Sequence, residues 1–220
     1  MSGENLTALN SELMDVRVEA RDLSRTAIEG YKPIINRAVG SALANVRKYV
    51  PGAYNSVRNF FKDQIIYNLE DFHRDEVGGY FVPDTNKLVA NIRMLRKNAS
   101  FFVEALYHEA KHAARKATGA MENLYRGFVN EAGPFLGSLL HRVYEEGAAS
   151  ALTEDDLGRT QDSYGLPRAA VRHVEKKMGS RVLVENNPND VPKILNYLVE
   201  AIQRYASQRR APAYALAYAR

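Results

Sequence analysis

The chain of 220 residues contains no cysteine. Disulfides, thiolate nucleophiles and metal sites with sulfur ligands are therefore excluded, and any bound metal needs nitrogen and oxygen ligands. The chain also lacks a run of about 18 apolar residues, so we expect no membrane-spanning segment. Its start has neither the basic region nor the apolar core of a secretory signal, which favours a cytoplasmic protein. Export by another route, or a place in a virus particle, would leave no trace here.

The composition is that of a globular protein, with 45% hydrophobic and 25% charged residues. The formal net charge is +4, but 26 acidic residues are interspersed among 30 basic ones. Proteins that bind polyanions cluster their basic and aromatic residues, which this chain does not do. A nucleic-acid partner is therefore not expected.

Apolar residues at helical spacing predict that most of the chain is helical. In the first third we expect three helices, with a break at Gly30 and Pro33, since proline inside a helix removes a hydrogen bond. The third of these helices is expected from about Ser56 through Leu69. Further helices are predicted over residues 100–119, 134–152 and 167–178 and from residue 190 onward.

A β-hairpin is predicted after Gly78-Gly79. Residues 80–82 and 88–92 include aromatic and β-branched residues and flank the turn residues Pro83-Asp84-Thr85-Asn86. This is the one good strand signal of the chain. The predicted fold class is therefore α+β and mostly helical, with a small antiparallel sheet.

We expect three parts along the chain. Residues 1–76 form an N-terminal helical segment, which is either a structural layer or an inhibitory pro-segment. Residues 77–208 form the main domain, and residues 209–220 form a flexible basic tail.

The sequence His108-Glu109-Ala110-Lys111-His112 is an H-E-x-x-H motif within the helix predicted over residues 100–119. Side chains four residues apart lie on one helical face, so His108 and His112 can bind one zinc ion. Glu109 lies beside them, where it can take a proton from a metal-bound water. Both histidines fall opposite the apolar face of this helix, so packing in a core does not explain them. The residues of that apolar face are Phe102, Leu106, Ala110, Ala113, Ala114 and Ala117.

A catalytic zinc site needs a third protein ligand, and the next long helix offers two glutamates. Glu145 falls opposite the apolar stripe of that helix, where it would be a solvated charge, paired with His141 one turn before. Glu146 flanks the stripe, at the edge from which a side chain can reach a neighbouring helix. Gly147 would let the backbones approach closely. Glu146 is therefore the favoured ligand.

The order of these features resembles the gluzincin metallopeptidases, which are zincins. The resemblance consists of a Y-F-V-x-D strand region, H-E-x-x-H on a helix and a downstream E-G-x-A on a second helix. It covers about residues 78–150. It implies a zincin-like fold with an edge strand, an active-site helix and a second ligand-bearing helix.

The resemblance also implies roles for the residues of these motifs. His108, His112 and Glu146 would bind Zn²⁺, and Glu109 would act as general base and acid in peptide hydrolysis. The strand 88–92 would border the cleft and pair with an extended peptide or protein substrate.

The chain departs from the gluzincin pattern in two ways. Ser150 stands where thermolysin-like members have an aspartate that orients a zinc histidine. The 33 residues between His112 and Glu146 also exceed the connection of that type, and small gluzincins of minimal design fit the size better. Zincins of another subclass use an aspartate as third ligand, for which Asp162 is the nearest match, but it lies too far from His112.

An oxyanion stabiliser is the remaining assignment, since gluzincins usually place a histidine or tyrosine at the carbonyl oxygen. The candidates are His173 and Tyr164, with Tyr144 as a further possibility. Two functions follow from the sequence: a zinc metallopeptidase, and a zincin fold kept as a binding or assembly component. The glutamate of H-E-x-x-H favours the enzyme, because a purely structural zinc site does not need it. The sequence predicts no oligomeric state.

Overall fold

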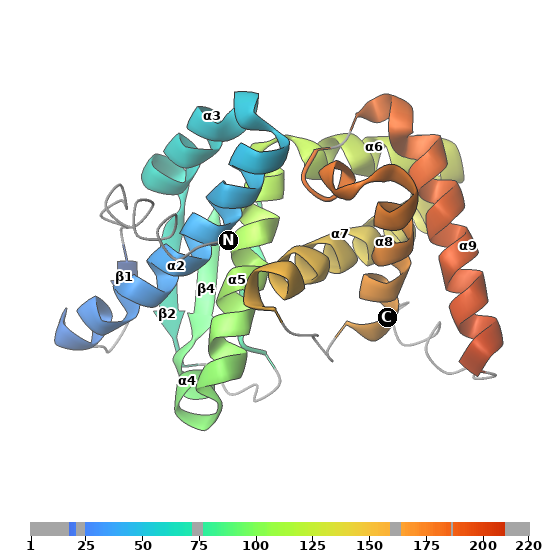
Figure 1. The fold of residues 1–220 in the computed structure, drawn as a ribbon. Coiled ribbons are helices and arrows are strands. Elements are labelled where there is room, and N and C mark those ends of the chain that lie inside the picture. Colours follow the sequence, from blue (N-terminus) through green and yellow to red (C-terminus); the bar gives the residue numbers. More distant parts are fainter. Residues whose placement is uncertain (1–17, 21–24, 72–76, 159–163, 186, 210–220) are drawn as a thin grey trace. The chain divides into compact units, whose positions relative to one another are not determined.

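The computed structural model consists of two compact units, Met1–Ala117 and Thr118–Arg220 (Figure 1). All strands of the described residues lie in the first unit, and the regular elements of the second are helices. The prediction of a mostly helical α+β fold is confirmed. The described residues are 18–20, 25–71, 77–158, 164–185 and 187–209.

A four-stranded sheet in the order β1-β2-β4-β3 forms the frame of the first unit. β1, β2 and β4 are parallel to one another, and β3 is antiparallel to β4. The predicted hairpin is confirmed as β3 and β4, but the sheet is mixed and not antiparallel, because β4 also pairs with β2. The strands are β1 (Val18–Ala20), β2 (Ile66–Glu70), β3 (Gly79–Val82) and β4 (Lys87–Asn91).

β2 lies where a helix was expected. The helix α3 (Tyr54–Asn59) passes into a π-helical turn, Phe60–Gln64, and Ile65 then takes extended backbone angles. In β2 the buried side chains are Tyr67 and Leu69, two residues apart, as on a strand with one buried face. A short apolar run of this kind does not distinguish a strand from the end of a helix, which is why the prediction was wrong here.

The helix α2 (Arg25–Tyr49) runs without a break through Gly30 and Pro33, so the predicted interruption is wrong. It packs against α5 (Ala99–Ala117) through one apolar stripe. Burial of that stripe offsets the cost of a proline inside the helix. The buried residues of the stripe are Ile35, Ala38, Val39, Ala42, Leu43 and Val46.

β4 is an interior strand, with β2 on one side and β3 on the other. The expectation that residues 88–92 pair with a substrate is therefore wrong, because both edges of β4 are already hydrogen-bonded. That this strand borders the cleft stays a prediction. β3 is the terminal strand of the sheet on that side. After β4, the side chain of Asn91 accepts from the N–H of Arg93 and so begins α4 (Ile92–Lys97).

The second unit is built from α6 (Ala120–Ala132), α7 (Pro134–Leu157), α8 (Gly165–Met178) and α9 (Val191–Arg209). α7 packs on α6 and α8, and α8 packs on α9. Pro134 begins α7, as predicted. The helix continues five residues beyond its expected end, to Leu157, and the following Gly158 ends it with a positive φ of 64°. Short 3₁₀ helices at Ser180–Leu183 and Pro188–Asp190 connect α8 to α9.

The boundary between the two units falls between Ala117 and Thr118 and not at residues 76–77, where a boundary was expected. That position falls between β2 and β3, which belong to one sheet. The expected basic tail lies outside the described residues from position 210 onward. None of the described helices combines the length and the apolar character needed to cross a bilayer.

Candidate metal centre

The H-E-x-x-H motif lies in the middle of α5, within the first unit. One face of α5 packs into the core through Phe102, Leu106, Ala110 and Ala113, as the helical pattern predicted. His108, Glu109 and His112 are themselves buried, with exposed fractions of 3%, 8% and 8%. The motif is therefore part of the protein interior and not a pair of surface histidines.

The two histidines point to the same place from successive turns of α5. Nε2 of His112 lies 3.0 Å from Nε2 of His108, and the rings meet edge to face with their centroids 4.7 Å apart. This follows from the spacing of four residues, which puts two side chains one above the other on a helix. The expected juxtaposition of the two imidazoles is confirmed.

The carboxylate of Glu109 is held by the sheet. Its Oε2 accepts a hydrogen bond of 2.8 Å from the main-chain N–H of Phe81 in β3. The same strand is fixed to α5 at its beginning, where a Cβ at Gly78 would lie 2.5 Å from Cβ of Ala105. The sequence did not predict this bond, because main-chain donors leave no mark in the amino-acid pattern.

The two adjacent glutamates of α7 have different environments. Glu145 is buried, with 5% exposed, and its Oε1 lies 3.5 Å from Nε2 of His141. The pairing with His141 is as expected, but the carboxylate is not solvated. Glu146 is half-buried. A Cβ at Gly147 would lie 2.3 Å from the carbonyl oxygen of Pro167, so this glycine permits close packing of α7 on α8.

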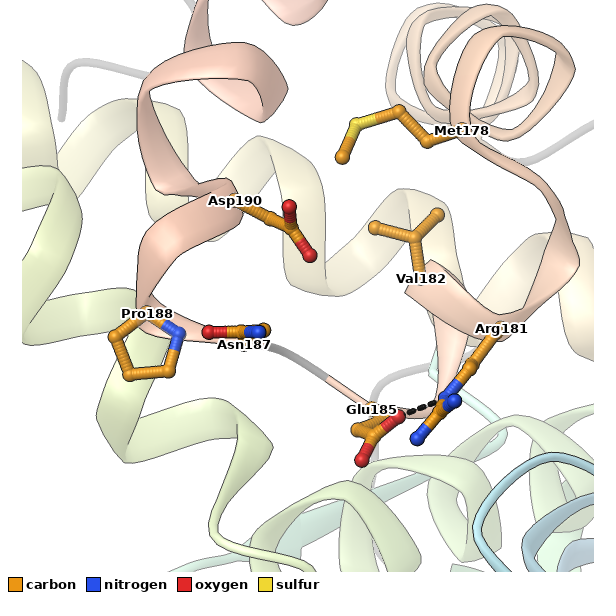
Figure 2. A pocket seen from close by; sticks show the side chains of 7 residues that line it. All are labelled: Met178, Arg181, Val182, Glu185, Asn187, Pro188 and Asp190. Carbon is orange, nitrogen blue, oxygen red and sulfur yellow. Dashed lines mark hydrogen bonds and ion pairs between the residues drawn. The ribbon is translucent and has the colours of Figure 1, made fainter.

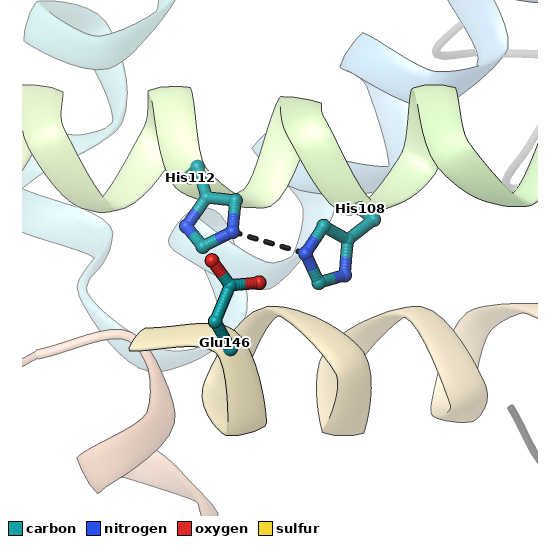
Figure 3. Close-up of side chains that lie close together, drawn as sticks. All are labelled: His108, His112 and Glu146. Carbon is teal, nitrogen blue, oxygen red and sulfur yellow. Dashed lines mark hydrogen bonds between the residues drawn. The ribbon is translucent and has the colours of Figure 1, made fainter. Parts of the chain in front are cut away.

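His108, His112 and Glu146 form a group whose candidate ligand atoms all lie within 4.8 Å of one another (Figure 3). Two ring nitrogens and one carboxylate oxygen make up the group, which is the donor set expected from the sequence. Glu146, and not Glu145, is the glutamate of this group. In Figure 3 its carboxylate is directed toward the two imidazoles.

The two candidate oxyanion stabilisers lie outside this group. Nε2 of His173 is 3.3 Å from a carboxylate oxygen of Glu200 in α9, and its ring meets that of Tyr197. Tyr164 precedes α8, where its carbonyl accepts from the N–H of Arg168. The catalytic role of either residue stays a prediction. Asp162, the weaker alternative for the third ligand, lies outside the described residues.

One charged residue of the motif has a role that the sequence reasoning missed. Lys111 is 1% exposed, and its Nζ donates to Oγ of Ser41 in α2 at 2.5 Å. Its position on the α2-facing side of α5 could have been found from the helical pattern, since Lys111 lies next to the buried Ala110 and Ala114. This contact joins α5 to α2.

A cavity of about 410 Å³ lies within the second unit, between α8 and the start of α9 (Figure 2). Met178 and Val182 give it an apolar side, and Asp190 is directed toward its interior. Arg181, on its rim, is paired with Glu185. The histidines and glutamates that could bind a metal lie on α5 and α7, so this cavity is not the candidate centre.

Comparisons with known proteins add no relative to this description. No family model matches the chain, and neither a curated protein nor a solved structure is significantly similar to it.

Proposed function

We propose that the protein is a zinc-dependent peptide hydrolase of the gluzincin type. In this proposal His108, His112 and Glu146 hold the metal, and Glu109 is the general base and acid. The observation that carries it is the group of two imidazoles and one carboxylate with ligand atoms within 4.8 Å of one another. The glutamate at the second position of the motif distinguishes a hydrolytic site from a merely structural one.

The residues fit zinc better than harder cations. Two imidazole nitrogens and one carboxylate are a ligand set of catalytic zinc sites, whereas calcium and magnesium prefer oxygen ligands alone. Two nitrogens bound to one tetrahedral zinc at about 2.0–2.1 Å lie roughly 3.3 Å apart. The separation of 3.0 Å between the two Nε2 atoms is close to this value. When bound, zinc supplies Lewis-acid chemistry that polarises a carbonyl and acidifies water.

The chain's own groups then divide the work. The Glu109 carboxylate accepts the proton of the attacking water and delivers it to the leaving amine. β3, the terminal strand of the sheet, is the strand to which an extended peptide would add, in place of the 88–92 strand. His173 and Tyr164 remain the candidates for stabilising the oxyanion.

The test combines elemental analysis with an assay of casein hydrolysis. The purified wild-type protein is expected to contain about one zinc per chain and to hydrolyse casein. Glu109→Gln is expected to keep its zinc and to lose activity by about 10²–10⁴-fold, the usual contribution of a general base. Full turnover by Glu109→Gln would show that the base is another group. Zinc without hydrolysis in the wild type would favour the alternative of a binding or assembly component.

A further inference from the structure

Glu109, the residue assigned as the base, occupies a main-chain donor of β3 that an added substrate strand would need. Oε2 of Glu109 accepts from the N–H of Phe81 at 2.8 Å, and both residues lie within the first unit. A main-chain N–H is a single donor, and a strong hydrogen bond satisfies it. While Glu109 holds this donor, no other acceptor can take it.

This N–H lies on the edge of β3 at which no strand of the described residues pairs. Asn91 donates its main-chain N–H to the carbonyl of Gly78. Because pairs alternate along an antiparallel ladder, Tyr80 and Val82 also pair with β4, whereas Gly79 and Phe81 direct their main-chain groups away from it. β3 ends the strand order β1-β2-β4-β3. The N–H of Phe81 is thus a donor that an added peptide strand would use.

β3 itself is fixed to α5 at both ends. At its start, Gly78 leaves no room for a Cβ between the strand and Ala105. At its far end, Nζ of Lys116 donates to the carbonyl of Pro83 and to Oδ1 of Asn86 in the turn. The bond between Glu109 and Phe81 therefore breaks by rotation of the glutamate side chain and not by movement of the strand.

We propose that a peptide strand which adds to β3 displaces Glu109 from the N–H of Phe81, so that the carboxylate is no longer held by the strand and can act as the base. This rests on the proposed function and names its substrate class: extended segments of polypeptide long enough to pair with β3. Short peptides leave Glu109 bonded to the strand and are hydrolysed slowly even at saturation. Phe81 acts through its main chain as a positioning residue and not as a catalytic one.

The substitution that tests this is Phe81→Pro, which removes the N–H. Proline is tolerated where the N–H faces away from the ladder, so no bond to β4 is lost. Phe81→Ala removes the ring and keeps the N–H, and Tyr80→Pro removes a ladder bond instead. The substrates are blocked alternating Ala-Ser peptides of two, four and eight residues, presented to the zinc-loaded protein.

For the wild type and Phe81→Ala, we expect kcat to rise at least about tenfold from the two-residue to the eight-residue peptide. In Phe81→Pro this rise is lost, because β3 holds Glu109 with none of the substrates, and KM for the eight-residue peptide increases. The same dependence of kcat on length in Phe81→Pro and in the wild type would overturn the proposal.

A second readout does not depend on activity. In NMR spectra of the zinc-free protein, the Phe81 amide proton is expected to exchange slowly, and faster in Glu109→Ala. Addition of the eight-residue peptide to the zinc-free protein is expected to shift this resonance in the wild type. In Phe81→Ala, which keeps the N–H, the amide resonance of residue 81 is expected to shift in the same way. An amide unaffected by Glu109→Ala, or by the peptide, would overturn the proposal. Failure of the zinc-loaded wild type to hydrolyse any peptide would reject the proposed function separately, whatever the amide does.

Discussion

The helices α5 and α7 each carry side chains of the candidate centre, but the two helices present them in different ways. On α5, His108 and His112 are brought together by the helix itself, because they are four residues apart. On α7, the choice falls between two neighbours, and packing decides it: Glu145 is buried beside His141, and Glu146 is half-buried. A ligand pair within one helix is thus a local property, whereas a single ligand depends on how its helix packs.

The surroundings of the two helices differ in the same sense. α5 is bonded to a sheet and to α2 by side chains that flank its histidines: Glu109 to β3, Lys111 to Ser41 and Lys116 to the 83–86 turn. α7 lies among helices, and Gly147 permits its close packing against the carbonyl of Pro167. The motif on α5 is therefore held from several sides within its own unit.

The largest effect is expected from breaking the pair on α5. His112→Ala removes one of two imidazoles at the centre and is expected to lower zinc affinity by more than about 100-fold, since even loss of an outer partner costs 10–100-fold. His173→Ala is the matched control, because that ring contacts Glu200 instead. Zinc content after dialysis distinguishes them. Equal zinc in His112→Ala and in the wild type would remove α5 from the metal site.

The next effect separates the two glutamates of α7. Glu146→Ala is expected to lower zinc content strongly and to change the unfolding free energy of the zinc-free protein by less than about 1 kcal/mol. Glu145→Ala is expected to keep zinc but to destabilise the protein by about 1–3 kcal/mol, because a buried partner of His141 is lost. Urea unfolding and elemental analysis of both variants check this. The reverse pattern would assign the ligand to Glu145.

The smallest effect concerns the strand that holds Glu109. In Gly79→Ala the new Cβ would lie 2.6 Å from the carbonyl oxygen of Val89, a main-chain atom that cannot turn aside. We expect a loss of about 1–3 kcal/mol in the free energy of unfolding. Gly30→Ala is the control, since nothing lies within 4 Å of that position in α2, and it should stabilise the protein by about 0.5–1 kcal/mol. A stable Gly79→Ala protein would mean that β3 packs less tightly on β4.

The comparison also explains what the sequence could predict. The hairpin and the orientation of His108 and His112 follow from local patterns of period two and about 3.6 residues, and the structure confirms them. The predicted pairing of β4 with a substrate was wrong because β4 already pairs with β2. That strand is distant in the sequence, and its apolar pattern resembles the end of a helix. The continuity of α2 through Pro33 was missed because packing against α5 outweighs a local preference. The bond from Phe81 to Glu109 uses a main-chain donor, which every residue except proline has.

X-ray absorption at the zinc edge of the purified wild-type protein tests the central claim most directly. The account predicts about one zinc per chain, bound by two imidazole nitrogens at about 2.0–2.1 Å and by carboxylate or water oxygens. A zinc environment without imidazole scattering, or a protein that takes up no zinc, would contradict it.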